Sequence, residues 1–432
     1  MAPRRPRKKG RIPDATATPA PAVASDALLS LPPEILDEIL ARLDLRDAVR
    51  TSALSRAWRR RWESLPSLDI STPFGDQPLW TVDCVLPRCP GRVRRFHVFL
   101  EELSARRRDD WLLVLSRRGG VEDLCLSPHS HPYEFFSLHS TVFSWRRLVS
   151  IDLFACHIPP LPPDFEGFPD LKVLTLANVK LQQNGEYQLE EIIETSPLLE
   201  KLILCEVCIV GDDFIEWEIR APNLRHITIC SNMDYGWNFA ELPCLHSAVI
   251  DLWEYVGDRD FAKFLAGLVH VRKLRLCMFY PPVNGIKILV TLPCTFDNLK
   301  TLKLFMHFCE LPQILLVFCV LRSVPNLEKL KILIYDGKEQ KIEANGEFLN
   351  AQWTDGMCAN LQILEMTGIN WLPNEMSFMK LILSKARLLH TLSISHHDDC
   401  LVSHMDPLHE LVTYKRATAQ AQVLFQGAAG NY

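Results

Sequence analysis

The hexapeptide LKVLTL at residues 171–176 carries the pattern that decides the fold. Leucine fills its first, fourth and sixth positions, and close copies occur at 199–204 (LEKLIL), 271–276 (VRKLRL), 299–304 (LKTLKL) and 389–394 (LHTLSI). If any aliphatic or aromatic residue is accepted at these three anchors, the chain holds thirteen copies, with one weak anchor at Ala248. They begin at Leu65, Val93, Val121, Leu148, Leu171, Leu199, Leu224, Leu245, Val271, Leu299, Leu327, Leu361 and Leu389.

The repeat predicts a solenoid. Most successive starts lie 21–28 residues apart, with one interval of 34, and this period is typical of leucine-rich repeats. The fourth and sixth positions alternate with polar residues, as in a short strand with one buried face. One unit cannot bury that face alone, so neighbours stack into a curved parallel sheet with helices and irregular turns on the convex side. A doubly wound α/β sheet is the alternative, but it would not need thirteen copies of one strand motif.

A second informative stretch precedes the repeats. Residues 26–71 read DALLSLPPEILDEILARLDLRDAVRTSALSRAWRRRWESLPSLDIS, which predicts three short helices. The first begins at 31–34 (Leu-Pro-Pro-Glu), because proline is tolerated where a backbone N–H has no helical partner. The second is expected over 47–52 and the third over 54–62. A unit of about 40 residues is marginal alone, so part of its apolar surface must contact the rest of the chain or another protein.

This stretch resembles the F-box. The matching residues are Leu31-Pro32, Ile39-Leu40, Leu43, Asp47-Ala48-Val49-Arg50, Ser52, Leu54-Ser55-Arg56, Trp58-Arg59 and Trp62. In that family the motif binds the Skp-type adaptor of SCF ubiquitin ligases. The resemblance therefore implies that the adaptor-facing residues are Leu31, Pro32, Ile35, Ile39, Leu40, Leu43, Val49, Leu54 and Trp58. The alternative is an amphipathic helical cap on the domain that follows.

The chain divides into four parts in this interpretation. Residues 1–25 are a disordered basic and Ala/Pro-rich tail, 26–64 the F-box, 65–397 the repeat domain and 398–432 a C-terminal tail. The last repeats, at about 355–397, resemble the FBD region found at the C-terminus of many plant F-box proteins. That resemblance rests on LQILEMTGI (361–369), Leu-Ile-Leu (381–383) and LLHTLSI (388–394).

Charge and composition narrow the classes of partner. The net charge is −5, but residues 4–11 hold six bases and no acid, so the remainder carries −11. Such a tail on an acidic body is an interaction arm and not a nucleic-acid-binding domain. It suggests nuclear import, with the nucleus and/or the cytoplasm as location; a disordered solubilising end is the alternative. No apolar run reaches the length of a membrane span, and the cysteines, including Cys205-x-x-Cys208, read as small hydrophobes.

No nucleophile, phosphate-loop or metalloprotease motif is present, so we expect neither an active site nor a cofactor. The F-box resemblance implies a non-catalytic substrate receptor of an SCF-type ligase, joined through the adaptor to cullin and RING subunits. A non-ligase leucine-rich-repeat scaffold is the alternative.

One patch on the predicted concave face is a candidate for substrate binding. The third and fifth positions of each motif, and the position after it, point to that face. Bases gather there in three consecutive repeats, beside one aromatic residue: Lys273, Arg275, Lys303, Phe305, Lys329 and Lys331. Because adjacent strands lie about 4.8 Å apart, these charges should share one surface. We expect it to bind an acidic or phosphorylated segment of a protein substrate; a solvated face is the alternative.

Overall fold

The computed structural model describes most of the chain. The described residues are 32–69 apart from 44, 55, 57 and 66; 80–100; 105–128; 135–211; 216–253; 261–278; 292–335 apart from 293; 344–396 apart from 345; and 405–428. Leu31, the predicted tail at 1–25 and the basic residues 4–11 lie outside these ranges.

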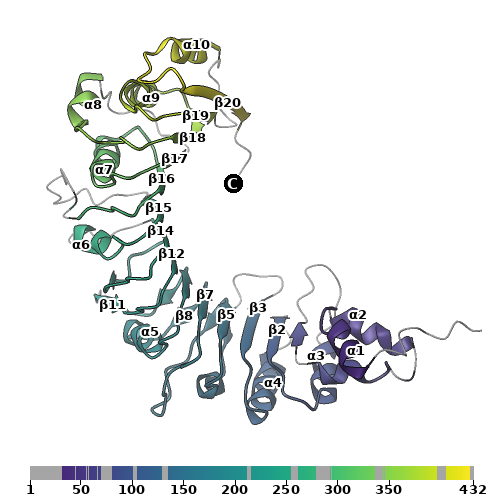
Figure 1. The fold of residues 1–432 in the computed structure, drawn as a ribbon. Coiled ribbons are helices and arrows are strands. Elements are labelled where there is room, and N and C mark those ends of the chain that lie inside the picture. The colour runs from purple at the N-terminus through teal and green to yellow at the C-terminus, as the bar shows by residue number, and fades with distance from the viewer. Residues whose placement is uncertain are drawn as a thin grey trace, which may run out of the picture.

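A parallel sheet of fourteen strands forms the inner wall of an open arc (Figure 1). In spatial order its strands are β1 (Ser67–Asp69), β2 (Arg95–Leu100), β3 (Asp123–Pro128), β5 (Ser150–Phe154), β7 (Val173–Ala177), β9 (Lys201–Cys205), β12 (His226–Ser231), β14 (Ser247–Leu252), β15 (Lys273–Met278), β16 (Thr301–Met306), β17 (Lys329–Ile334), β18 (Ile363–Ile369), β19 (Thr391–His396) and β20 (Gln422–Ala428). The predicted solenoid is confirmed, and each of the thirteen motifs supplies one strand.

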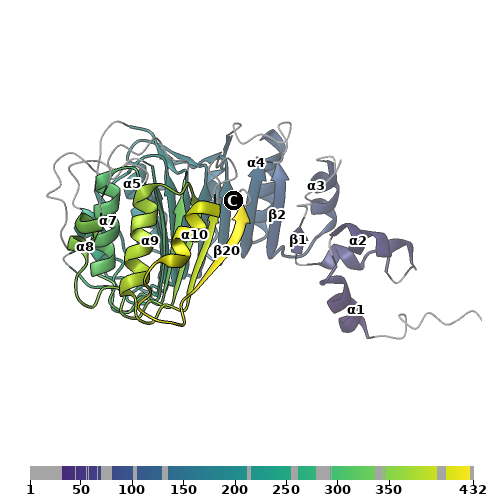
Figure 2. The same cartoon turned by 90° about the horizontal axis from the view of Figure 1, so that it is seen from above.

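Helices and short strands cover the outer side of the arc (Figures 1 and 2). The helices are α3 (Trp80–Val85), α4 (Ala105–Arg117), α5 (Gly185–Glu194), α6 (Phe261–Ala266), α7 (Leu311–Arg322), α8 (Gly346–Gln352), α9 (Pro373–Lys385) and α10 (Met405–Thr413). Two small sheets complete this outer layer. One consists of β4 (Phe136–Ser137), β6 (Cys156–His157), β8 (Lys180–Leu181) and β10 (Cys208–Ile209), and the other of β11 (Trp217–Ile219) and β13 (Trp237–Phe239).

The core lies between the two layers and follows the anchors of the motif. In β7 the side chains of Leu174 and Leu176 are buried, whereas Thr175 between them faces the concave surface. Even the weak anchor Ala248 is buried. Each fully buried leucine contributes about 1.5–3 kcal/mol to stability, and one continuous cluster of buried residues runs from Leu36 to Ala421.

Asparagines at the turn before a strand fix the spacing between neighbouring repeats. The Asn223 side-chain amide donates to the Pro197 carbonyl oxygen at 2.8 Å. The Asn326 side-chain amide donates to the backbone carbonyl oxygen of Asp297 at 2.9 Å. Asn360 donates to the Pro325 carbonyl oxygen at 3.1 Å. These bonds satisfy carbonyl groups that the strand ladder does not reach.

The structure at the C-terminal end differs from one predicted domain boundary. Residues 398–432 were predicted to be a tail, but 405–428 contain α10 and β20, and β20 pairs with β19 in parallel. The sheet therefore extends by one further strand. The repeat motif did not predict this strand because Gln420 occupies the position that aligns with Leu389, although Ala421 next to it is buried.

The N-terminal unit is less helical than predicted. It contains α1 (Pro33–Leu40), α2 (Leu45–Arg50) and two 3₁₀ turns, η2 (Thr51–Ala53) and η3 (Arg61–Ser64). The described residues between Leu54 and Arg60 form turns, so the structure does not confirm the predicted third helix over 54–62. Bases crowd this stretch, and like charges such as Arg56 and Arg60, four residues apart, disfavour a helix.

Candidate interaction surfaces

The N-terminal unit presents an apolar surface at one end of the arc. Ile35, Ile39 and Leu43 follow one another at intervals of four along α1 and the turn after it, which places them on one side. Ile35 is 41% exposed and Leu43 39%, while Ile39 is half-buried. Leu54, in the following segment, is 60% exposed. Exposed leucine and isoleucine on so small a unit are typical of a surface that another protein covers.

The neighbouring side of α1 holds the unit to the repeats. Leu36 and Leu40 are buried with Trp58 and Trp62 in the same cluster as the first strands of the solenoid. Arg61 supports this contact, because its guanidinium donates to the Pro33 carbonyl oxygen at 3.2 Å and to Asp37 Oδ1 at 2.8 Å. The F-box-like unit and the solenoid therefore share one core.

The predicted adaptor-facing residues differ in how far their side chains are exposed. Pro32, Ile35, Leu43 and Leu54 are exposed, and Ile39 and Val49 are half-buried. Leu40 and Trp58 are buried. We correct their assignment, since both side chains are already covered by the chain itself and have no surface left for a partner. The periodicity placed them on the apolar stripe but could not tell which edge of that stripe faces inward.

The predicted basic patch forms on the concave face of β15, β16 and β17. The register aligns two rows of three residues, and we call these six positions the basic grid. The rows are Lys273–Thr301–Lys329 and Arg275–Lys303–Lys331. Five of the six side chains are basic and the sixth carries a hydroxyl group. Phe305, two residues after Lys303 on the same face of β16, lies beside the grid.

Two acids border the basic grid. Asp251 Oδ2 on β14 lies 3.4 Å from Arg275 Nη2. On β18, Glu365 Oε2 lies 2.6 Å from Lys331 Nζ, and its other oxygen pairs with Lys329. Burial alone would raise the pKa of Glu365, but its hydrogen bonds to these two lysines lower it below the ordinary value. An acid thus pairs with bases at each edge of the grid, Asp251 on the β14 side and Glu365 on the β18 side.

The base at the centre of the grid has no acid as a partner among the described residues. Lys303 makes no ion pair with any residue that the structure describes. Its Nζ lies 5.2 Å from the centre of the Phe305 ring, and the Arg275 guanidinium lies 4.4 Å above the same ring. Burial, followed by the charges of Arg275 and Lys331, lowers the pKa of Lys303. An anion at this point would relieve the repulsion.

The six predicted substrate-facing residues are therefore brought together, although their role is untested. Sequence reasoning missed Thr301, Asp251 and the pairing role of Glu365. Each could have been predicted from the sequence, because all three occupy positions that point to the concave face. Thr301 and Glu365 are at the third and fifth motif positions, and Asp251 is at the position after a motif.

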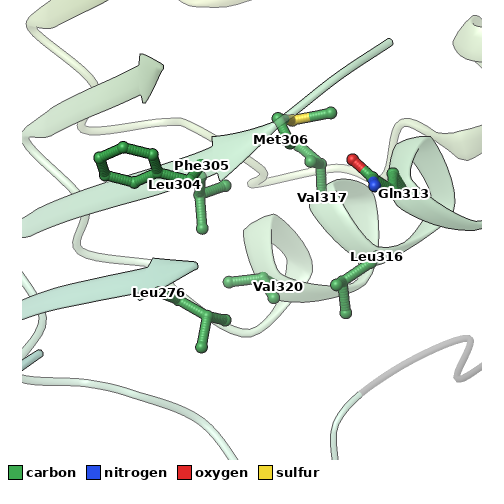
Figure 3. Close-up of a pocket in the computed structure, with 8 residues that line it drawn as sticks. All are labelled: Leu276, Leu304, Phe305, Met306, Gln313, Leu316, Val317 and Val320. Carbon is green, nitrogen blue, oxygen red and sulfur yellow. The ribbon is translucent and has the colours of Figure 1, made fainter. Parts of the chain in front are cut away.

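An apolar pocket lies on the other side of the sheet, between β15, β16 and α7 (Figure 3). Gln313 is the polar side chain among the eight that Figure 3 labels. It is buried, accepts a hydrogen bond from the His307 backbone N–H at 2.8 Å and donates to the Tyr335 hydroxyl at 3.1 Å. Since its polar atoms already have partners, we interpret the pocket as a packing gap between strand and helix.

Neither a metal centre nor a membrane span is evident in the part of the chain that the structure describes. Its His, Cys, Asp and Glu residues form no group of three or more that could hold a metal ion. None of its helices is both long and apolar enough to cross a bilayer.

Comparison with known proteins agrees with this architecture. Residues 28–69 match the F-box domain. Residues 108–332, about half of the chain, match the family described as FBD-associated F-box protein At5g56370, LRR repeats. An F-box followed by leucine-rich repeats makes the chain a protein-interaction adaptor. The chain belongs to the family of FBD-associated F-box proteins with leucine-rich repeats.

Similar proteins come from a plant, Arabidopsis thaliana. F-box/FBD/LRR-repeat protein At1g13570 is 27% identical over 422 residues, which cover 93% of this chain and 98% of the relative. FBD-associated F-box protein At5g60610 is 24% identical over 404 residues, covering 86% of this chain and all of the relative. These full-length matches support a plant origin and the predicted FBD region.

Proposed function

We propose that this protein is the substrate-recognition subunit of an SCF-type E3 ubiquitin ligase. The exposed apolar surface around Ile35, Leu43 and Leu54, which we call the F-box surface, would bind the Skp-type adaptor, and through it the cullin and RING subunits. The repeats would hold the target protein. The observation that carries the proposal is the match of residues 28–69 to the F-box, together with the exposed Ile35, Leu43 and Leu54 in that segment.

In this role the chain performs no covalent step. Ubiquitin transfer would take place on other subunits of the ligase. The receptor's contribution would be to keep the target close to the loaded conjugating enzyme, which raises the effective concentration of the reacting groups. The basic segment at residues 4–11 would favour entry into the nucleus, and a fluorescent fusion with and without these residues tests that point.

A binding assay with the purified adaptor tests adaptor docking. The variant Ile35→Asp/Leu54→Asp places two charges on the exposed apolar surface without touching the core. A hot-spot residue at an interface is worth about 2 kcal/mol or more, so the double variant should bind at least tenfold more weakly. Val412→Asp is a matched control, because Val412 is an exposed apolar residue (61%) on α10 at the other end of the arc.

The same assay distinguishes the proposed ligase subunit from the alternative, a non-ligase leucine-rich-repeat scaffold. If the intact protein fails to bind the adaptor, or if the Ile35→Asp/Leu54→Asp variant binds as well as the Val412→Asp control, the ligase assignment is wrong.

A further inference from the structure

The basic grid has the geometry of an anion site. Its residues come from three adjacent parallel strands in register, so the side chains rise from neighbouring points about 4.8 Å apart. Thr301 lies between Lys273 and Lys329 in one row, and in the other Lys303 lies between Arg275 and Lys331. An anion above Thr301 and Lys303 would therefore be surrounded by bases.

The charges of the grid are only partly compensated. Three of its five bases already pair with Asp251 or Glu365. Lys303 and Lys273 pair with no acid among the described residues, and Arg275 Nε is a buried donor without a partner there. Repulsion among side chains held this close costs free energy, which a bound anion would recover.

We propose that the basic grid binds a phosphorylated serine or threonine in a segment of the target protein. This inference rests on the proposed function, since it names the chemical class of the target. A phosphate ester carries about −1.5 to −2 charges and three acceptor oxygens at pH 7, so it matches several bases around one point better than a single carboxylate. Phe305 offers an apolar ring beside the phosphate position.

The borders of the grid favour a peptide over a nucleic acid. Asp251 and Glu365 limit the patch to three strands, whereas a nucleic acid presents a continuous row of phosphates. Outside residues 1–11 the chain carries a net charge of −11, which would repel such a row. One phosphate on a protein segment fits the size of the patch.

Peptide binding by the purified full-length protein tests the proposal. The probes are fluorescein-labelled 15-residue peptide pools of random sequence with a fixed central phosphothreonine, threonine or glutamate, measured by fluorescence anisotropy at two salt concentrations. We expect the phosphothreonine pool to bind at least tenfold more tightly than the other two. We also expect its binding to weaken at high salt, because partly exposed charges are screened.

Two charge reversals locate the site. Lys303→Glu should weaken binding of the phosphothreonine pool at least tenfold. Lys201→Glu makes the same charge change on the same face, in β9, outside the basic grid, and should have no effect. Circular dichroism of Lys303→Glu should match the wild type, because the side chain is partly exposed.

Three other results of the peptide-binding assay would overturn the proposal. Equal binding of the phosphothreonine and threonine pools would exclude a phosphate site, and equal binding of the glutamate pool would identify an acidic segment instead. Inorganic phosphate that binds as tightly as the peptide would point to a free phosphate. Adaptor binding by Lys303→Glu is measured alongside: its retention shows that a failed peptide assay concerns the basic grid and not the proposed ligase function.

Discussion

Glu375 makes the stability of the C-terminal repeats dependent on pH. This carboxyl group lies in the first turn of α9 and is completely buried. Its Oε2 accepts hydrogen bonds from the backbone N–H groups of Asn370 and Leu372, both at 3.0 Å. Oε1 meets no donor among the described residues, and burial raises the pKa of Glu375 to about 7. We predict that Glu375→Gln stabilises the protein at pH 8 but not at pH 4.5.

The sign and size follow from proton linkage. The carboxyl group ionises near its ordinary pKa of 4.5 in the unfolded chain and near 7 in the folded one. Between these values the folded state holds a proton that the unfolded state has released, so stability is fully present below pH 4.5 and falls as the pH rises towards 7. One pH unit corresponds to about 1.4 kcal/mol, and the whole window to about 3 kcal/mol. Glutamine keeps an acceptor oxygen for the cap but carries no charge.

Urea unfolding of both proteins between pH 4.5 and 8 measures this effect. The difference in unfolding free energy should grow by about 3 kcal/mol over the window, and a difference that does not change with pH would refute the reasoning. Glu375→Ala is the second variant. It leaves two backbone N–H groups unpaired and should cost about 1–3 kcal/mol even at pH 4.5. Because repeat arrays can unfold in parts, hydrogen exchange of α9 should show the same dependence locally.

Three further predictions concern the core and the concave face. Trp62→Ala should cost about 3–5 kcal/mol and speed hydrogen exchange of α1; unchanged exchange would show that the tryptophan does not join the two parts. Gly368→Ala should lower the unfolding free energy by about 1–3 kcal/mol, measured in urea, because Gly368 has φ +76° and an added Cβ would lie 2.4 Å from the Ile334 carbonyl oxygen. Cys205 should react with iodoacetamide faster than Cys156, as followed by mass spectrometry. A hydrogen bond from Cys230 lowers the pKa of Cys205, whereas burial raises that of Cys156 to about 12; equal rates would contradict this.

The repeat architecture could be predicted because one local rule determines it many times. Apolar side chains must alternate wherever a strand has one buried face, so every motif marked its strand, including the one with the weak anchor Ala248. The helices expected on the convex side also formed, among them α5 and α6. The last strand was not predicted because its first anchor position holds Gln420, a polar residue, at the edge strand of the described sheet.

Features that depend on contacts between distant segments could not be predicted in the same way. The Leu40 and Trp58 side chains fit an exposed stripe as well as a buried one, and the choice is made by packing against Trp62 and the first strands. The ion pairs of Asp251 and Glu365 depend on side-chain reach across strands. The row of bases was predictable, since thirteen aligned motifs determine which residues become neighbours.

The two candidate surfaces are joined by the core itself. The F-box surface lies at one end of the arc and β15–β17 lie well along it (Figure 1). One continuous cluster of buried residues connects them, with Trp62 at the junction. A target held at the basic grid would thus be kept in a fixed position relative to the adaptor, because an array of packed repeats transmits position without a flexible linker. Such a fixed position matters for ligation, since a transfer step gains rate when its reactants are held close and oriented.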